Sequence, residues 1–225
     1  MVQDKERPWR PSEHYKDRAV AERYDAERFA SIPGRLFNYL ETRTILAAFR
    51  DLLPPGAVIA DVPCGTGRVA EVLLRSGYRV VGVDISPAML EVARRRLAPF
   101  GDRFEARVAD VLDLDDGAWG DGACRFDGAL CCRVLMHFSM AQQRDFLSNV
   151  ASLTRGPVVF NHSRITAYQR LRRRAKRLLG HGAVDHPLSD SELSALITGA
   201  GLRENARRWV LAPLSEAAVF TCTHG

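Results

Sequence analysis

An acidic residue and two glycines lie close together in the segment VIADVPCGTGRVA, residues 58–70. An apolar run typical of a strand reaches Asp61, and after a short turn a helical pattern begins near Arg68. Gly65 and Gly67 can adopt φ angles that are closed to other residues, and the absence of a Cβ lets a ligand approach the backbone. The following helix presents free N–H groups to such a ligand. The segment therefore indicates a nucleotide site, with an ordinary strand-to-helix turn as the alternative.

The glycines alone do not decide the kind of nucleotide. The string GTGRVA fits the G-x-G-x-x-G/A dinucleotide fingerprint, so nicotinamide and other adenosine cofactors are both compatible with it. Asp61, however, stands at the end of the strand, where its carboxylate would repel a pyrophosphate and hold a cationic amine. This placement favours a ligand with an ammonium group.

Two more acidic residues end predicted strands. Asp84 follows Asp61 by 23 residues, about the spacing expected for an acid that binds ribose hydroxyls across one βαβ unit. Asp110 follows the strand predicted over 104–109, so all three carboxylates are expected at the same edge of a parallel sheet. The alternatives are that Asp84 caps the helix that begins at Ser86, and that Asp110 is a turn residue.

The loop DVPCGTG at 61–67 and the string DISPAML at 84–90 resemble the class I S-adenosylmethionine-dependent methyltransferases. The resemblance implies that Asp61 and the loop hold the methionine end of S-adenosyl-L-methionine, with S-adenosyl-L-homocysteine as the product. The chain departs from the family at Pro63, where glycine is usual, and proline removes a backbone donor. The cofactor-binding residues implied are Asp61, Pro63, Cys64, Gly65, Gly67, Asp84, Ile85 against adenine, Asp110 and Val111 near the adenine amino group, Arg133, and Tyr24 near the methionine moiety.

These motifs require a doubly wound α/β fold to position them. By resemblance, a seven-stranded, mostly parallel sheet with helices on both faces is expected, in the order 3-2-1-4-5-7-6 with the seventh strand antiparallel. The Rossmann-like domain is expected over residues 55–225. Residues 1–54 are predicted to form an N-terminal helical cap, with helices over 12–29 and 36–52 separated by a break at Pro33. Tyr24 can alternatively be a helix residue that packs on the domain.

Two histidines are candidates for a catalytic base. His137 follows the fourth predicted strand, over 125–132, at the edge that is expected to face the transferable methyl group. His162 ends the fifth strand. A histidine there can accept a proton from a hydroxyl or amine as it is methylated, because its ordinary pKa lies near 6.5. The alternative for His137 is packing under the next helix. Cys131 and Cys132 are adjacent in a strand, so they should point to opposite faces as core residues.

A basic segment, RITAYQRLRRRAKR, occupies residues 164–177 and has seven basic residues and no acidic one. Its apolar residues keep helical spacing, which predicts an amphipathic helix within a lid-like insertion over 163–188. Three roles are open for this helix: a solvated face, recognition of an anionic substrate, and peripheral contact with an anionic membrane.

Composition limits the remaining possibilities. The chain has 225 residues and a formal net charge of +5, which permits acidic partners without demanding nucleic acid. Its five cysteines form no CxxC pair, and no zinc or other metal site is expected. The first residues lack an apolar signal segment, and no run of about 18 apolar residues follows. A cytoplasmic location is therefore expected.

The sequence thus predicts an enzyme that transfers a methyl group from S-adenosylmethionine to a small-molecule or lipid-like acceptor. An acceptor with an anionic group would suit the basic segment. Transfer from a sulfonium is an in-line displacement that demands alignment more than acid or base help. The alternatives are a nicotinamide-dependent oxidoreductase, which would leave Asp61 and Asp110 unexplained, and a non-catalytic module that binds S-adenosylmethionine.

Overall fold

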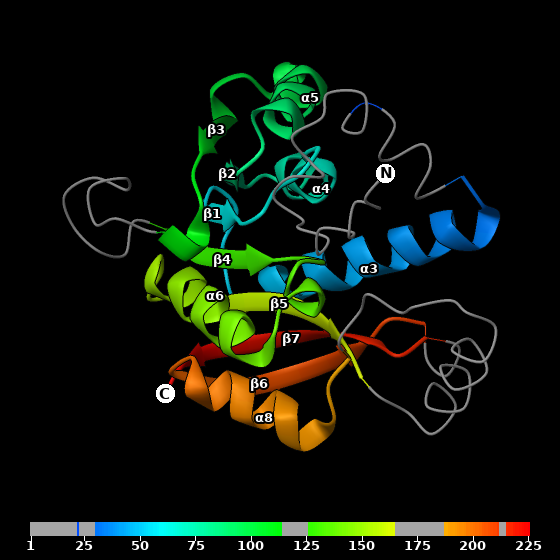
Figure 1. Ribbon diagram of the computed structural model, residues 1–225. Helices are drawn as coiled ribbons and strands as arrows, with labels where there is room; N and C mark the ends of the chain where they lie inside the picture. The colour runs from blue at the N-terminus through cyan, green and yellow to red at the C-terminus, as the bar shows by residue number, and fades with distance from the viewer. Residues whose placement is uncertain (1–21, 23–29, 114–125, 165–186, 212–214) are drawn as a thin grey trace, which may run out of the picture.

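The computed structural model describes residue 22 and residues 30–113, 126–164, 187–211 and 215–225. Its helices (α), 3-10 helices (η) and strands (β) alternate along the chain (Figure 1). In chain order they are α3 (Ile32–Arg50), β1 (Val58–Asp61), α4 (Arg68–Arg75), β2 (Arg79–Asp84), α5 (Pro87–Leu97), η1 (Ala98–Arg103), β3 (Phe104–Val108), η2 (Val111–Asp113), β4 (Gly128–Cys131), η3 (Leu135–His137), α6 (Met140–Ser152), β5 (Val158–Ser163), α8 (Asp190–Gly199), β6 (Leu202–Trp209) and β7 (Ala217–His224).

The strands form one seven-stranded sheet in the order β3-β2-β1-β4-β5-β7-β6. Neighbouring strands from β3 to β5 pair in parallel, whereas β7 is antiparallel to both β5 and β6. This confirms the predicted fold class and strand order. The carboxyl ends of β1, β2, β3 and β4 consequently share one edge of the sheet, where ligands bind in folds of this type.

Helices cover both faces of the sheet. On one face, Phe49 of α3 and Leu73 of α4 share a core cluster with Ile59 and Leu130 of the sheet. On the other, α6 and α8 pack against residues such as Ala60 and Cys131. Figure 1 shows α3, α4 and α5 on one side of the strands and α6 and α8 on the other. The alternation along β1 and β4 follows the period of two in strands.

The two adjacent cysteines confirm this alternation. Cys131 belongs to the cluster under α6 and α8, whereas Cys132 belongs to the cluster under α3 and α4. They therefore point to opposite faces, as predicted. Both are buried and free, and Cys132 also lines a cavity.

Capping residues explain where several helices begin. Ser86 caps α5 by accepting from the Met89 N–H, while Ser139 and Ser189 form capping boxes with Gln142 and Glu192 at the starts of α6 and α8. The cap of α5 is Ser86 itself, so the alternative that Asp84 caps this helix is wrong.

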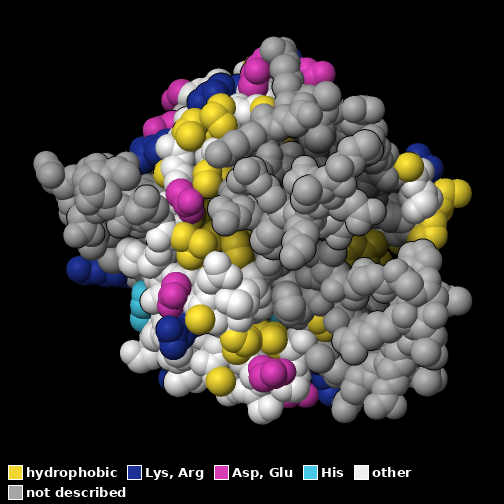
Figure 2. All heavy atoms as spheres, viewed as in Figure 1, with side chains coloured by type: hydrophobic (Ala, Val, Ile, Leu, Met, Phe, Trp, Pro, Cys, Tyr) yellow, Lys and Arg dark blue, Asp and Glu magenta, His cyan; other side chains and the backbone are white. Residues whose placement is uncertain are grey.

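The predicted break at Pro33 is wrong. Helix α3 begins at Ile32, and Ser31 caps it by accepting from the Gly34 N–H. A proline in the first turn costs nothing there because its missing N–H has no partner within the helix. Figure 2 shows hydrophobic side chains at the surface where α3 begins, and Ile32 is 74% exposed.

Strand β6 begins at Leu202, and its solvent-facing charged residues hide the strand pattern in the sequence. The helix predicted over 12–29, the role of Tyr24 and the basic segment after Arg164 lie outside the described residues, except Glu22. None of the helices in the described ranges combines the length and apolar character that crossing a bilayer requires.

Candidate functional site

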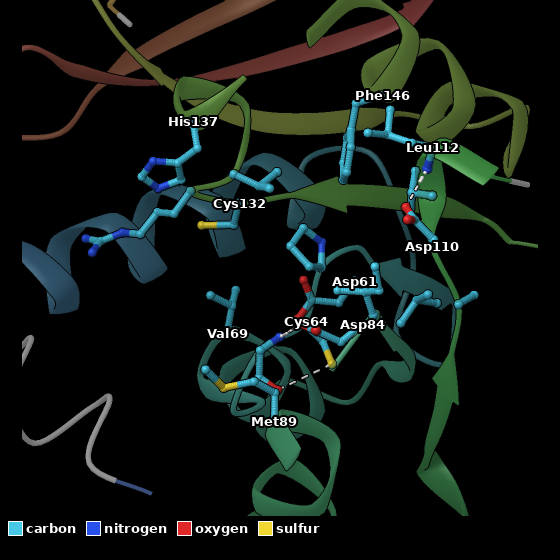
Figure 3. A pocket seen from close by; sticks show the side chains of 18 of the residues that line it. Asp61, Cys64, Val69, Asp84, Met89, Asp110, Leu112, Cys132, His137 and Phe146 are labelled. Carbon is cyan, nitrogen blue, oxygen red and sulfur yellow. Dashed lines mark hydrogen bonds between the residues drawn. The ribbon is translucent and has the colours of Figure 1, made fainter. Parts of the chain in front are cut away.

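A cavity of about 530 Å³ opens at the carboxyl ends of β1 to β4 (Figure 3). It brings together residues that are far apart in sequence and that the motifs singled out. The predicted site residues that line it are Asp61, Pro63, Cys64, Gly65, Asp84, Ile85, Asp110, Val111, Arg133 and His137. Gly67 and His162 are absent from the lining, and Tyr24 lies outside the described residues.

Asp61 is the most unusual of these residues. Its side chain is almost fully buried at the end of β1, and neither carboxylate oxygen has a hydrogen-bond partner of normal geometry in the described part of the chain. Burial, with a smaller effect of the Asp84 charge, raises the pKa of Asp61 to about 8, while the Arg68 charge and the Ala70 backbone N–H oppose the rise. A buried carboxylate without a partner is costly unless a cation or donor compensates it. The cavity is where such a group would sit.

The two glycines of the loop have different tasks. Gly65 has φ +53°, and a Cβ added there would meet open space at the cavity wall. Gly67 has φ +76°, but its added Cβ would come within 2.8 Å of Leu97 in α5. Gly65 therefore keeps the cavity open for a ligand, whereas Gly67 lets α4 and α5 pack closely.

The loop is held by backbone contacts. The Cys64 N–H donates to the Val83 carbonyl, and the Gly65 N–H donates to Asp84 Oδ2, both at 2.8 Å. These two N–H groups are therefore engaged with the protein, and contacts to a ligand would use the exposed Gly65 backbone surface. Arg96 of α5 also donates to the Thr66 carbonyl and hydroxyl, at 3.0 and 3.1 Å. The Val62–Pro63 peptide bond is cis.

Asp84 is buried at the end of β2 and accepts hydrogen bonds from two backbone N–H groups. Besides Gly65, it accepts from the Ser86 N–H at 2.9 Å. Burial raises its pKa to about 6, opposed by these two hydrogen bonds. A carboxylate has about four acceptor positions, so lone pairs remain for ribose hydroxyls.

Asp110 is more exposed than the other two acids. Its Oδ1 accepts from the Leu112 N–H at 2.9 Å, which closes the turn into η2. The carbonyl of Val111 accepts from Asn149 of α6 at 2.6 Å. The turn role and a binding role are compatible, since one oxygen of Asp110 makes the turn and the residue also lines the cavity.

Figure 3 shows His137 and Cys132 across the cavity from Asp110 and Leu112. Downstream of His137, Phe138 and Phe146 also line the cavity, and their rings stack with centroids 5.5 Å apart. This wall is largely apolar, so it can exclude water from the part of the cavity beside His137.

His162 is not placed for catalysis. It is buried, it does not line the cavity, and its ring nitrogens lie 2.9 Å from the Ser163 carbonyl and 3.1 Å from Gln143 Oε1. Burial lowers its pKa, opposed by the backbone contact. The ring is therefore enclosed by Gln143 and the Ser163 carbonyl away from the cavity, and the structure gives the predicted base role of His162 no support.

Comparison with known proteins adds an independent observation. A family model described as a methyltransferase domain matches residues 59–156, from β1 to the residues before β5. The chain is similar to the ubiquinone biosynthesis O-methyltransferase of Xanthomonas axonopodis pv. citri, with 35% identity over 86 residues. That match covers 38% of this chain and only 34% of the relative's length.

Two longer matches cover most of the fold. The chain is 28% identical over 165 residues to the magnesium-protoporphyrin O-methyltransferase of Rhodobacter capsulatus, which covers 69% of this chain and 70% of the relative. A crystal structure of magnesium protoporphyrin IX methyltransferase from Synechocystis PCC 6803 with bound S-adenosylhomocysteine superposes with a TM-score of 0.71 at 15% identity. It covers 92% of this chain and 99% of that one.

These comparisons place a methyltransferase-domain match over residues 59–156, and the fold of the chain is similar to that of a methyltransferase crystallised with S-adenosylhomocysteine. The family match contains β1 to β4, and hence the three strand-end acids and His137. Within the described residues, no group of three or more histidine, cysteine or acidic side chains is arranged to hold a metal ion.

The sequence motifs missed one important group at this cavity. Glu41 of α3 is 1% exposed and pairs with Arg133 at 2.7 Å and with Arg68 at 3.6 Å, and both arginines line the cavity. A signal was present, because Glu41 interrupts the apolar stripe that Ile45 and Phe49 continue. An acid on the buried face of a helix implies a buried cation as its partner.

Proposed function

We propose that this protein transfers a methyl group from S-adenosylmethionine to a small-molecule acceptor and leaves S-adenosylhomocysteine. The observation that carries the proposal is Asp61: a buried carboxylate without a hydrogen-bond partner of normal geometry in the described residues, at the wall of a cavity. An ammonium group compensates such a carboxylate, whereas a pyrophosphate would be repelled by it. The alternative of a nicotinamide cofactor is therefore not favoured.

The residues present fit the cofactor along its length. Asp61 would hold the amino group of the methionine end, and Gly65 leaves room for close approach to the loop. Asp84 retains acceptor positions for ribose hydroxyls. Ile85, Asp110 and Val111 line the cavity beyond Asp84 and would surround adenine.

When bound, S-adenosylmethionine supplies an electrophilic methyl group on its sulfonium. The chain's own residues then bind and orient: Asp61 and Asp84 fix the two ends relative to the acceptor, which reduces the entropic cost of an in-line displacement. Phe138 and Phe146 exclude water from the cavity. His137 accepts the proton that a hydroxyl or amine acceptor loses as its new bond to the methyl carbon forms.

The names of the relatives support a small-molecule acceptor, since they refer to ubiquinone biosynthesis and to magnesium protoporphyrin. A lipid-like or anionic acceptor, and contact of the basic segment 164–177 with an anionic membrane, stay proposals from the sequence. So does a cytoplasmic location, which the free, buried state of the described cysteines supports.

Calorimetry and thermal shift with S-adenosylhomocysteine and NAD, side by side, test the cofactor. We expect the first to bind and to raise the melting temperature by mass action, and NAD to do neither. Binding of NAD alone would overturn the proposal.

Transfer is tested with S-adenosylmethionine carrying a labelled methyl group and a cell extract separated into lipid, small-molecule, RNA and protein fractions. Label in the small-molecule or lipid fraction is expected. Label only in RNA or protein would contradict the acceptor class, and binding without transfer to any fraction would indicate a non-catalytic module.

A further inference from the structure

Four charged side chains meet at one end of the cavity. Glu41 of α3 lies within ion-pair distance of both Arg133, at 2.7 Å, and Arg68, at 3.6 Å. The charges of Arg68 and Asp61 act on each other, since Arg68 opposes the rise in the pKa of Asp61. The group therefore contains two acids and two arginines.

The Cys132 thiol, at the cavity wall, is affected by all four of these charges. Burial raises the pKa of Cys132 to about 12, and Glu41 and Asp61 raise it further, while Arg68 and Arg133 lower it. All four charges are therefore close to Cys132, which lines the cavity on the same side as His137 (Figure 3). Asp61, Arg68 and Arg133 line the cavity themselves, and Glu41 does not.

Glu41 also closes a ring of hydrogen bonds around the backbone of Arg133. Its Oε2 accepts from Arg133 Nε at 2.7 Å, and its Oε1 accepts from Asn161 Nδ2 at 2.7 Å. Asn161 Oδ1 in turn accepts from the Arg133 backbone N–H at 2.6 Å. Arg133 has φ +59°, a conformation that residues with a Cβ rarely adopt, so the ring holds a strained residue at the cavity wall.

The charges suit a zwitterion. The amino-acid end of the cofactor has an ammonium group and a carboxylate. The Asp61 carboxylate at the cavity wall suits the ammonium group. The carboxylate then requires a cation in the same cavity, and Arg68 and Arg133 both line it. Glu41 neutralises one of these two positive charges and, through Nε, sets the direction of the Arg133 guanidinium.

We propose that Glu41 is a positioning residue for the amino-acid end of the cofactor: from outside the cavity it orients Arg133, and with it Arg68, to bind the cofactor carboxylate. This inference rests on the proposed function. It assigns to α3 a part in cofactor recognition that the sequence motifs do not contain.

Two probes distinguish this role from a purely structural one. S-adenosylhomocysteine has the amino-acid end, and 5′-methylthioadenosine lacks it but retains the adenosine and the sulfur. We expect Glu41→Gln to weaken S-adenosylhomocysteine binding about tenfold or more, by calorimetry, while 5′-methylthioadenosine binding changes less than about twofold. Glu41→Asp, which retains the charge, should restore part of the loss.

Glu204→Gln is the matched control. Glu204 pairs with Arg207 at 2.9 Å, and the Arg207 guanidinium lies over Phe220 much as that of Arg133 lies over Phe37. This pair is on β6, and neither residue lines the cavity. The control should leave binding of both probes unchanged. Equal weakening of both probes by Glu41→Gln, or no change in either, would overturn the inference.

Removing one partner of a buried ion pair is destabilising, so Glu41→Gln can fail to fold. The double variant Glu41→Gln/Arg133→Leu removes both charges of the shorter ion pair and so reduces that penalty. It should lose the preference of the wild type for S-adenosylhomocysteine over 5′-methylthioadenosine, and an unchanged preference would contradict the inference. If the wild type binds neither probe, the proposed function fails instead, so the two failures are distinguishable.

Discussion

The wall of the cavity formed by β1, β2 and β3 presents three carboxylates, whereas the wall formed by the end of β4, η3 and α6 presents Arg133, His137 and two phenylalanines. Each acid stands within two residues of a strand end, and its hydrogen bonds, where it has them, run to nearby loops. On the second wall, Arg133 depends on Glu41, which is 92 residues away in sequence.

This difference suggests a division of labour. The first wall has the buried acids and the open Gly65 backbone that suit cofactor binding. The second wall, apart from Arg133, has the His137 ring and the apolar side chains that suit methyl transfer. Substitutions on the first wall should therefore change binding, and substitutions at His137 should change turnover. The following predictions on binding and turnover test that division, from the largest effect to the smallest, and a last one on stability follows from the same pKa.

Gly65→Val should abolish binding of S-adenosylhomocysteine while the fold is retained. The new side chain would fill the cavity wall at a φ of +53° that valine tolerates poorly. Gly56→Val is the control, since Gly56 also has a positive φ and open space around its Cβ but does not line the cavity. Both variants should lose similar thermal stability, and only the first should lose binding. Unchanged affinity in folded Gly65→Val would place the ligand elsewhere.

His137→Gln should lower kcat by about 100-fold on the acceptor found by labelled transfer, the lower end of the range for general bases. The Kd for S-adenosylhomocysteine should stay unchanged, because His137 is on the other wall. His224→Gln, at a histidine that contacts the Thr154 carbonyl outside the cavity, is the control. A kcat equal to that of the wild type would show that His137 takes no part in methyl transfer.

Asp84→Ala should weaken cofactor binding by roughly 1.5 to 3 kcal/mol, the range for hydrogen bonds to a charged group. Part of this loss comes from the Gly65 N–H, which loses its acceptor. Calorimetry measures the change, and kcat at saturating cofactor should be nearly unaffected. A change in affinity below the error of the measurement would exclude Asp84 from the site.

The pH dependence of binding tests Asp61. Its pKa of about 8 means that the ligand-free protein holds this carboxyl protonated at neutral pH, whereas binding an ammonium group requires the carboxylate. The Kd for S-adenosylhomocysteine should therefore fall about tenfold per pH unit from pH 6 to 7.5. Asp61→Asn should bind weakly and without this slope. A slope that survives in Asp61→Asn would assign the titration to another group.

The same pKa has a consequence for stability. Because the folded state binds a proton at Asp61 that the unfolded state has released above pH 4, stability should fall as pH rises from about 4 through 8. Asp61→Asn removes that loss, so the ligand-free variant should melt higher than the wild type at pH 8. A lower melting temperature would show that Asp61 stabilises the empty fold.

The first wall was predictable from local sequence patterns, and the strand order of the sheet followed from the family resemblance. Strand, glycine turn and helix start are local patterns, and in a parallel sheet the carboxyl ends of the strands share one edge. The spacing of Asp61, Asp84 and Asp110 was therefore enough to expect them together, and the cavity lining contains all three. Errors in this part were confined to boundaries such as the start of α3, where a proline is compatible with the first turn.

Only the tertiary structure distinguished His137 from His162 as a candidate base. Both histidines follow or end neighbouring strands, so they look alike in sequence. One lines the cavity, and the other is buried against Gln143. The ring of Glu41, Arg133 and Asn161 was equally hidden, because it joins three elements that are distant along the chain. Burial, and with it the raised pKa of Asp61, depends on how such distant elements pack together, and no local pattern records that.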